Sequence, residues 1–183
     1  MTGIFGGAFD PPHLGHAALL SRASEHFALE RLVVLVVADP GHKGVHADAA
    51  ARLELARAAF PDAEVEIDPH ARTVDLLREG RFADPLFLIG ADELVDLPTW
   101  KEPEEVLRLA RLGVATRPGY PQERLEAALA QLDRPERVLF FEIDPVPVSS
   151  SEVRDRIARG ESIDELVPAG VARAIERYGL YRS

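Results

Sequence analysis

The first 27 residues contain the feature that most constrains the fold. A short apolar segment over 3–5 precedes the paired glycines Gly6 and Gly7, and an amphipathic segment follows over 14–27. The pattern predicts a strand, a sharp turn and a helix, because residues without a Cβ let the backbone turn tightly and let a ligand approach it. The helix would aim its N-terminal N–H groups at the turn, which favours an anionic ligand there.

Two histidines, His13 and His16, stand at the start of this predicted helix. Their spacing places both imidazoles on one helix face, and a ring that is protonated or donates a hydrogen bond stabilises negative charge, which indicates phosphate contact. Three other interpretations stay open. The glycines are common at any strand-to-helix turn of a doubly wound fold, the histidines could ligate a metal although no third ligand stands nearby, or either ring could be solvated.

Downstream, strand-like apolar segments alternate with segments of helical periodicity. This alternation predicts an α/β fold of the Rossmann-like, doubly wound type, with a mostly parallel sheet and helices on both faces. We expect a single domain over 1–183, with 149–183 as its C-terminal helical part. Strands are predicted over 31–38, 64–67, 85–89, 113–116 and 138–143, and helices over 47–60, after Thr73, and over 103–112, 122–132, 163–166 and 168–178.

The predicted helix over 47–60 has a small apolar face. Leu53, Ala56, Ala59 and Phe60 are expected to point inward. Arg52 on the same helix is interpreted as a solvated side chain, with a role beside the preceding loop as the alternative.

Composition excludes several classes of protein. The net charge of −10 argues against a nucleic-acid-binding surface, and the absence of cysteine excludes disulfides, thiolate catalysis and cysteine-based zinc sites. No apolar run approaches the roughly 20 residues of a membrane span, and the N-terminus reads as a strand rather than a signal segment. We therefore expect a cytoplasmic protein that contacts neither nucleic acid nor membrane; homo-oligomerisation stays open.

Polar turns follow two of the predicted strands, at the edge where the loops of an open parallel sheet build a ligand site. The turn over 38–44 carries His42 and Lys43, and Lys43 is one of only two lysines in the chain. Arg117 follows the strand over 113–116 in an Arg-Pro-Gly turn. A plain polar turn is the alternative interpretation for both.

The strand over 85–89 runs into Gly90 and Asp92. Gly90 would let a ligand ring lie against the backbone, and Asp92 could accept hydrogen bonds from ribose hydroxyls. A capping role for Asp92 on the following helix is equally natural.

A second anion-binding pattern stands near the C-terminus. Ser149 and Glu152 have capping-box spacing, which predicts a helix start. Free N–H groups, the hydroxyl of Ser150 and the guanidinium of Arg154 one turn later would together form an anion cradle. An ordinary capping box is the alternative.

The residues over 6–16 read Gly-Gly-Ala-Phe-Asp-Pro-Pro-His-Leu-Gly-His. This string resembles the signature of the nucleotidyltransferase superfamily marked by His-x-Gly-His, and it is most similar to that of bacterial nicotinate-nucleotide adenylyltransferases. The segments over 42–43, 90–100 and 149–154 resemble the same family in the same order. The chain departs from the family pattern at Ala8, Gly41, Ala71 and Arg72.

The resemblance implies a nucleotidyltransferase that joins ATP and nicotinate mononucleotide to give deamido-NAD and pyrophosphate in NAD biosynthesis. It implies that Mg²⁺ arrives with ATP rather than at a protein metal site. Because the reaction needs no protein nucleophile, the protein would align the two phosphates and stabilise the charge of the transition state.

The resemblance also assigns residues to these tasks. It implies phosphate and catalytic contacts from His13, His16, Lys43 and Arg154. It implies ATP binding by Gly6, Gly7, Ala8, Phe9, His16, Gly90, Asp92, Arg117, Ser149, Ser150 and Arg154. It implies nicotinate-nucleotide binding by Gly7, Ala8, Lys43, Thr73, Trp100 and Lys101, with Trp100 stacking on the pyridine ring. A helix cap for Thr73 and packing alone for Trp100 are the alternatives.

Other functions compete with this interpretation. The acceptor could be nicotinamide mononucleotide or phosphopantetheine, and a cytidylyltransferase shares His-x-Gly-His; the loop over 39–43 and Trp100 argue against the last two. A tRNA synthetase fragment is disfavoured by the acidic charge and the lack of a Lys-Met-Ser-Lys-Ser segment. A non-catalytic nucleotide sensor is disfavoured by the intact His13, His16 and Arg154.

Overall fold

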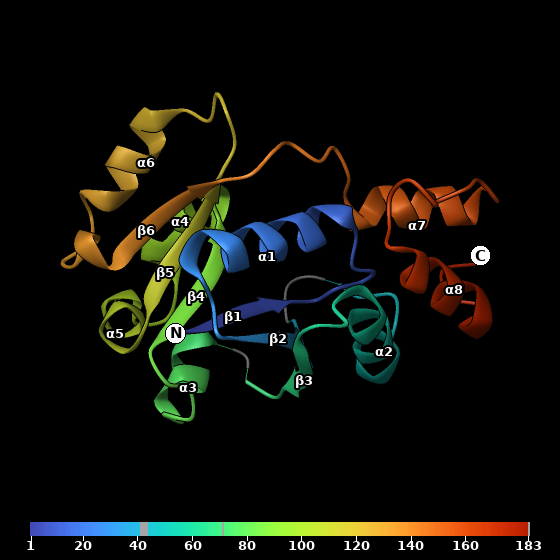
Figure 1. The fold of residues 1–183 in the computed structure, drawn as a ribbon, viewed down its shortest axis with the longest axis horizontal. Helices are drawn as coiled ribbons and strands as arrows, with labels where there is room; N and C mark the ends of the chain where they lie inside the picture. Colours follow the sequence, from blue (N-terminus) through green and yellow to red (C-terminus); the bar gives the residue numbers. More distant parts are fainter. Residues whose placement is uncertain (41–43, 71, 183) are drawn as a thin grey trace. The chain divides into compact units, whose positions relative to one another are not determined.

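The structure, a computed structural model, describes residues 1–40, 44–70 and 72–182 (Figure 1). The chain divides into two compact units. The first comprises Met1–Phe5, Leu20–Leu32 and Arg72–Pro145, and the second comprises Gly6–Leu19, Val33–Ala71 and Val146–Ser183.

The described chain contains a sheet of six strands with the order β3-β2-β1-β4-β5-β6. Strand β1 pairs with β4, β4 with β5, β5 with β6 and β2 with β3, each in parallel. The prediction of an α/β fold with a parallel sheet is confirmed. The strands are β1 (Thr2–Gly7), β2 (Arg31–Val37), β3 (Glu64–Asp68), β4 (Pro85–Gly90), β5 (Arg111–Thr116) and β6 (Val138–Glu142).

Helix α1 (Leu14–Phe27) has the bounds that its periodicity predicts, and it buries Leu20 and Ala23. In the first unit, the chain after β3 forms α3 (Thr73–Arg78), α4 (Ala91–Asp96), α5 (Pro103–Leu109) and α6 (Gln122–Leu129). Two short 3₁₀ turns, η1 (Leu97–Thr99) and η2 (Pro135–Arg137), complete it.

Two predicted helices of this unit were wrong at their C-terminal ends. The helix predicted over 103–112 ends at Leu109 because Ala110 is extended (φ −138°, ψ 161°), and Leu112 is buried in β5 instead. The helix predicted over 122–132 ends at Leu129. Local apolar periodicity does not mark these ends, because a buried strand also reads as a continuous apolar run.

In the second unit, α2 (Ala49–Ala59), α7 (Ser150–Ala158) and α8 (Ala169–Tyr178) accompany β2 and β3. Asp48 caps α2 by accepting the Ala51 N–H at 2.7 Å. Helices α2 and α8 lie close together: a Cβ on Gly170 would lie 2.8 Å from the carbonyl oxygen of Ala58. Glycine is therefore needed where the two helices meet.

Two sequence predictions for the second unit were wrong. Leu55, not Leu53, is the fully buried leucine of α2. The segment over 163–166, predicted as a helix, forms a turn before α8. Four residues are too short a segment to distinguish a turn from a helix by periodicity.

Candidate active site

The turn after β1 is built around Phe9. Its side chain is 2% exposed, and its backbone has φ 50°, which is uncommon for a residue with a bulky side chain. The ring packs edge-on against His16 and Phe60, with centroid distances of 5.3 and 5.5 Å. A Cβ on Gly7 would lie 2.9 Å from the Phe9 ring, so the second glycine makes room for this packing.

His13 and His16 stack on each other at the N-terminus of α1. Their ring centroids are 3.7 Å apart and their planes are inclined by 26°. The backbone N–H of His13 donates to Nδ1 of His16 at 3.2 Å, so the neutral His16 ring carries its proton on Nε2. Nδ1 of His13 is buried without a hydrogen-bond partner among the described atoms. The predicted pairing of the two imidazoles on one helix face is confirmed.

Both imidazoles are neutral in this structure at pH 7. Burial lowers the pKa of His13 to about 4. Burial, and then the charge of His13, lowers the pKa of His16 to about 3. Of the two forms that the sequence allowed, the structure supports the neutral hydrogen-bond donor. A bound polyanion would raise both pKa values, because a nearby opposite charge favours the protonated ring.

Asp10 is buried in the turn, and its carboxylate binds residues that are distant in sequence. The sequence did not reveal this role. The residue is 4% exposed. Oδ2 accepts the N–H of His46 at 2.7 Å, and Oδ1 accepts the N–H of Ala47 at 3.1 Å and the hydroxyl of Tyr181 at 2.8 Å. Both oxygens of this carboxylate therefore accept hydrogen bonds from distant parts of the chain.

Arg52 on α2 is buried, so its interpretation as a solvated side chain was wrong. It is 1% exposed and donates to the carbonyl oxygens of Ala47, Ala8, Val37 and Ala38 at 2.8–3.1 Å. These bonds tie the Gly-rich turn to the end of β2 and to the chain that enters α2. A signal for this existed in the sequence, because Arg52 shares its helical face with the buried residues at 55, 56 and 59.

The helix start predicted at the second anchor is confirmed, and α7 contacts the turn. Ser149 caps α7 by accepting the Glu152 N–H at 3.1 Å, which confirms the helix start. The Ser150 hydroxyl donates to the carbonyl oxygen of Pro11 at 2.8 Å. Nη1 of Arg154 donates to the carbonyl oxygen of Asp10 at 2.6 Å, and Nη2 donates to the Ser151 hydroxyl at 3.2 Å.

The second unit thus brings together one group of the predicted residues. Helix α7 donates hydrogen bonds to the carbonyl oxygens of Asp10 and Pro11, which stand between the Gly-rich turn and the stacked histidines in the chain. The predictions for His42 and Lys43, and the departures at Gly41 and Ala71, lie outside the described residues. The members of this group are Gly6, Gly7, Ala8, Phe9, His13, His16, Ser149, Ser150 and Arg154.

The first unit holds Gly90, Asp92 and Arg117. Glu93 caps α4 by accepting the Gly90 N–H at 3.0 Å, so the alternative of Asp92 as the cap was wrong. Oδ1 of Asp92 instead accepts the Tyr120 hydroxyl at 2.9 Å. Arg117 lines a cavity of about 580 Å³ at the ends of β5 and β6, together with Tyr120 and Phe140.

The first unit also holds Thr73, Trp100 and Lys101. Thr73 begins α3, but Arg72 is the cap residue, so the alternative of Thr73 as a helix cap was wrong. Trp100 is half-buried, and its ring packs edge-on against Phe87 at a centroid distance of 6.5 Å.

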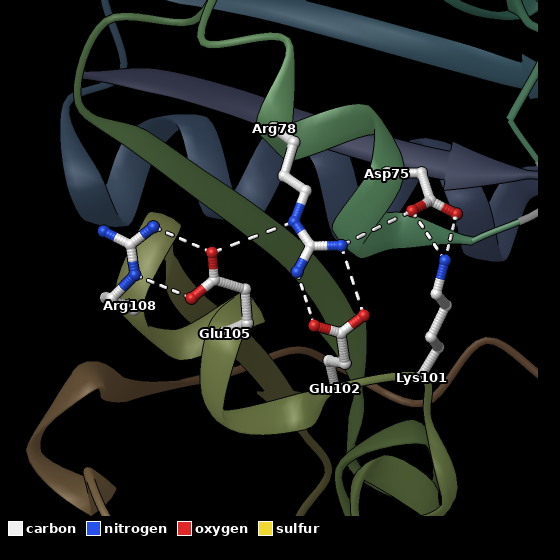
Figure 2. A network of polar contacts seen from close by, with 6 residues as sticks. All are labelled: Asp75, Arg78, Lys101, Glu102, Glu105 and Arg108. Atoms are coloured by element: carbon white, nitrogen blue, oxygen red, sulfur yellow. Dashed lines mark hydrogen bonds and ion pairs between the residues drawn. The ribbon is translucent and has the colours of Figure 1, made fainter.

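An ion-pair network joins α3 to the segment that follows Trp100 (Figure 2). Nζ of Lys101 contacts both carboxylate oxygens of Asp75, at 2.8 and 3.0 Å. Arg78 forms a bidentate ion pair with Glu102, and its Nε lies 3.8 Å from Oε1 of Glu105. The positive charge of Lys101 is therefore balanced by Asp75 in this structure.

The described residues show no group of three histidine, cysteine or acidic side chains suited to hold a metal ion. Among the same residues, no helix is long and apolar enough to cross a bilayer.

Comparison with known proteins identifies the family. Residues 4–156 match the family model described as cytidylyltransferase-like. A probable nicotinate-nucleotide adenylyltransferase of Thermus thermophilus is 40% identical over 98% of each chain. One of Rubrobacter xylanophilus is 38% identical over all of this chain and 92% of its own.

Solved structures agree on the fold. A Plasmodium falciparum nicotinic acid mononucleotide adenylyltransferase complexed with NaAD superposes with a TM-score of 0.76 at 18% identity, covering 98% of this chain and 96% of that chain. The chain therefore belongs to the cytidylyltransferase-like family and, within it, to the nicotinate-nucleotide adenylyltransferases, which are nucleotidyltransferase enzymes.

Proposed function

We propose that this protein transfers the adenylyl group of ATP to nicotinate mononucleotide, forming deamido-NAD and pyrophosphate. A phosphate oxygen of the mononucleotide attacks the α-phosphorus of ATP, and the bond between the α- and β-phosphates breaks as pyrophosphate leaves. The observation that carries the proposal is the stacked, neutral pair of His13 and His16 at a helix N-terminus. The choice of acceptor is supported by the names of full-length relatives.

His16 is the proposed transition-state donor. The N–H of His13 donates to Nδ1 of His16, so the neutral ring carries its proton on Nε2. In the proposed mechanism this Nε2–H donates to a phosphate oxygen of bound ATP. As the bond to the α-phosphorus breaks, negative charge moves onto the bridging oxygen of the departing pyrophosphate, so a fixed donor beside the reacting phosphates lowers the barrier. His13 would contact the same triphosphate.

The N-terminus of α7 is the proposed site for the rest of the triphosphate. Ser149 caps this nine-residue helix, and its first N–H groups and dipole favour an anion. Arg154 is one turn further along and carries a permanent positive charge. Ser150 adds a hydroxyl, and Lys43 is the cation that the family resemblance adds to this group.

The first unit supplies the proposed nucleoside contacts. Gly90 and Asp92 would contact the adenosine, and Arg117 would contact the adenine side of the same nucleotide. Thr73, Trp100 and Lys101 would bind the nicotinate nucleotide, with the half-buried indole stacking on the pyridine ring. The backbone of Gly6, Gly7, Ala8 and Phe9 would line the approach to the phosphates.

Mg²⁺ is proposed to arrive bound to the ATP phosphates, keeping mostly phosphate and water ligands. Its chemistry is to neutralise charge on the triphosphate and on the departing pyrophosphate. We also propose that the enzyme works in the cytoplasm, in keeping with its acidic charge and lack of cysteine.

The test is pyrophosphate release from ATP and Mg²⁺ with three acceptors offered separately. We expect turnover with nicotinate mononucleotide to exceed that with nicotinamide mononucleotide. Turnover with phosphopantetheine alone would overturn the acceptor assignment. ATP binding without turnover on any of the three would favour a nucleotide sensor.

A further inference from the structure

Tyr181, near the C-terminus, contacts the turn that carries the two histidines. Its hydroxyl donates to Oδ1 of Asp10 at 2.8 Å, although 171 positions separate the two residues in sequence. Gly179 ends α8 in the left-handed conformation, and Tyr181 itself has φ 63°. A bulky residue held in this sparsely populated region suggests that the surrounding contacts have a function.

Asp10 links three parts of the second unit through its buried carboxylate. It accepts the N–H groups of His46 and Ala47, which directly precede α2, and the hydroxyl of Tyr181. Because a buried carboxylate needs donors in place of water, each donor constrains where the side chain lies. Tyr181 supplies one of the three donors, and it alone comes from the C-terminal segment.

The backbone of the same turn accepts hydrogen bonds from α7. Arg154 donates to the carbonyl oxygen of Asp10, and Ser150 donates to the carbonyl oxygen of Pro11. The two side chains proposed to bind the triphosphate are therefore bonded to the dipeptide whose side chain Tyr181 holds. Displacing Asp10 would displace the acceptors of both.

We propose that Tyr181 is a positioning residue for ATP: through Asp10, it holds the turn where Arg154 and Ser150 are aligned on the triphosphate. The inference rests on the proposed function, because it takes these two side chains as phosphate ligands. Burial, and then the hydrogen bond to Asp10, raises the pKa of the Tyr181 hydroxyl, which therefore stays a donor at neutral pH.

The test compares Tyr181→Phe with Tyr178→Phe. Tyr178 ends α8 and is 49% exposed. Its hydroxyl makes no hydrogen bond to any residue that the structure describes, so its variant controls for the loss of a nearby hydroxyl. We expect Tyr181→Phe to lower kcat by about tenfold and to weaken ATP binding, because the buried Asp10 carboxylate loses a hydroxyl donor. Tyr178→Phe should match the wild-type protein in kcat and in ATP affinity.

ATP affinity is measured by calorimetry without an acceptor, and kcat is measured at 25 °C beside the Tm of each variant. A lower Tm for Tyr181→Phe with unchanged kcat and ATP affinity would mean a structural role only and would overturn the proposal. If wild-type protein binds ATP but does not form deamido-NAD, the proposed function fails, whereas the ATP affinities still decide the role of Tyr181.

A double-mutant cycle tests whether the effect passes through Asp10. In an Asp10→Ala background, Tyr181→Phe should cause little further loss of kcat. If the two single-mutant losses of kcat multiply in the double mutant, Tyr181 acts independently of Asp10 and the proposal fails. If Asp10→Ala does not fold, the comparison of Tyr181→Phe with Tyr178→Phe decides the matter.

Discussion

The half-buried histidine pair should make this protein lose stability in mild acid. The pKa of His13 falls from 6.5 in the unfolded chain to about 4 in the folded chain. Between these two values the unfolded chain binds more protons, so stability rises with pH there. The contribution of His13 is complete above pH 6.5 and is lost as the pH falls towards 4. Replacing His13 with Asn removes this dependence.

The expected magnitude follows from the linkage of proton binding to folding. For a group that stays unprotonated in the folded state, each pH unit below 6.5 lowers the free energy of unfolding by about 1.4 kcal/mol. His13 therefore accounts for a fall of about 2 kcal/mol in the free energy of unfolding between pH 7 and pH 5. His16 adds to the effect in the same direction, and the charge of His13 contributes to the low pKa of His16. Between pH 7 and pH 5, the free energy of unfolding of the His13→Asn variant should therefore fall by at least about 2 kcal/mol less than that of the wild-type protein.

The assay is urea unfolding of both proteins at pH 7 and pH 5, without nucleotide. The comparison uses the difference between the two pH values within each protein, so any packing change caused by Asn at position 13 cancels. Equal losses in the two proteins would refute the reasoning, because they would mean that His13 is protonated at pH 5 in the folded state. Adding a triphosphate should reduce the difference, since an anion beside the rings raises their pKa values.

Three further outcomes are expected. His16→Ala should lower kcat by about 100-fold or more with little change in Tm, as expected for loss of a transition-state donor, and full activity would remove His16 from the mechanism. Trp100→Ala should raise the KM for nicotinate mononucleotide more than that for ATP; the reverse pattern would place the indole beside adenine or in a packing role. Arg52→Met should lower the free energy of unfolding by about 3–5 kcal/mol in urea titrations, because it leaves four buried carbonyl oxygens without their donor, and a loss under about 1 kcal/mol would contradict this.

Much of the fold could be predicted from the sequence because its signals are local. Paired glycines, a helical repeat and capping residues each act over a few positions, and they predicted the bounds of α1 and the start of α7 correctly. The order of apolar strands and amphipathic helices was enough to predict a parallel α/β fold. The stacking of His13 on His16 also follows from local spacing.

Other features were decided by tertiary structure. Arg52 looks like a surface residue until the carbonyl oxygens of three separate segments converge on its guanidinium. Asp10 gains its role from an N–H pair 36 and 37 positions away and a hydroxyl 171 positions away. The low pKa values of the histidines likewise depend on burial. Sequence by itself determined the local elements and the family pattern, whereas hydrogen-bond partners and desolvation arise only when distant segments are brought together.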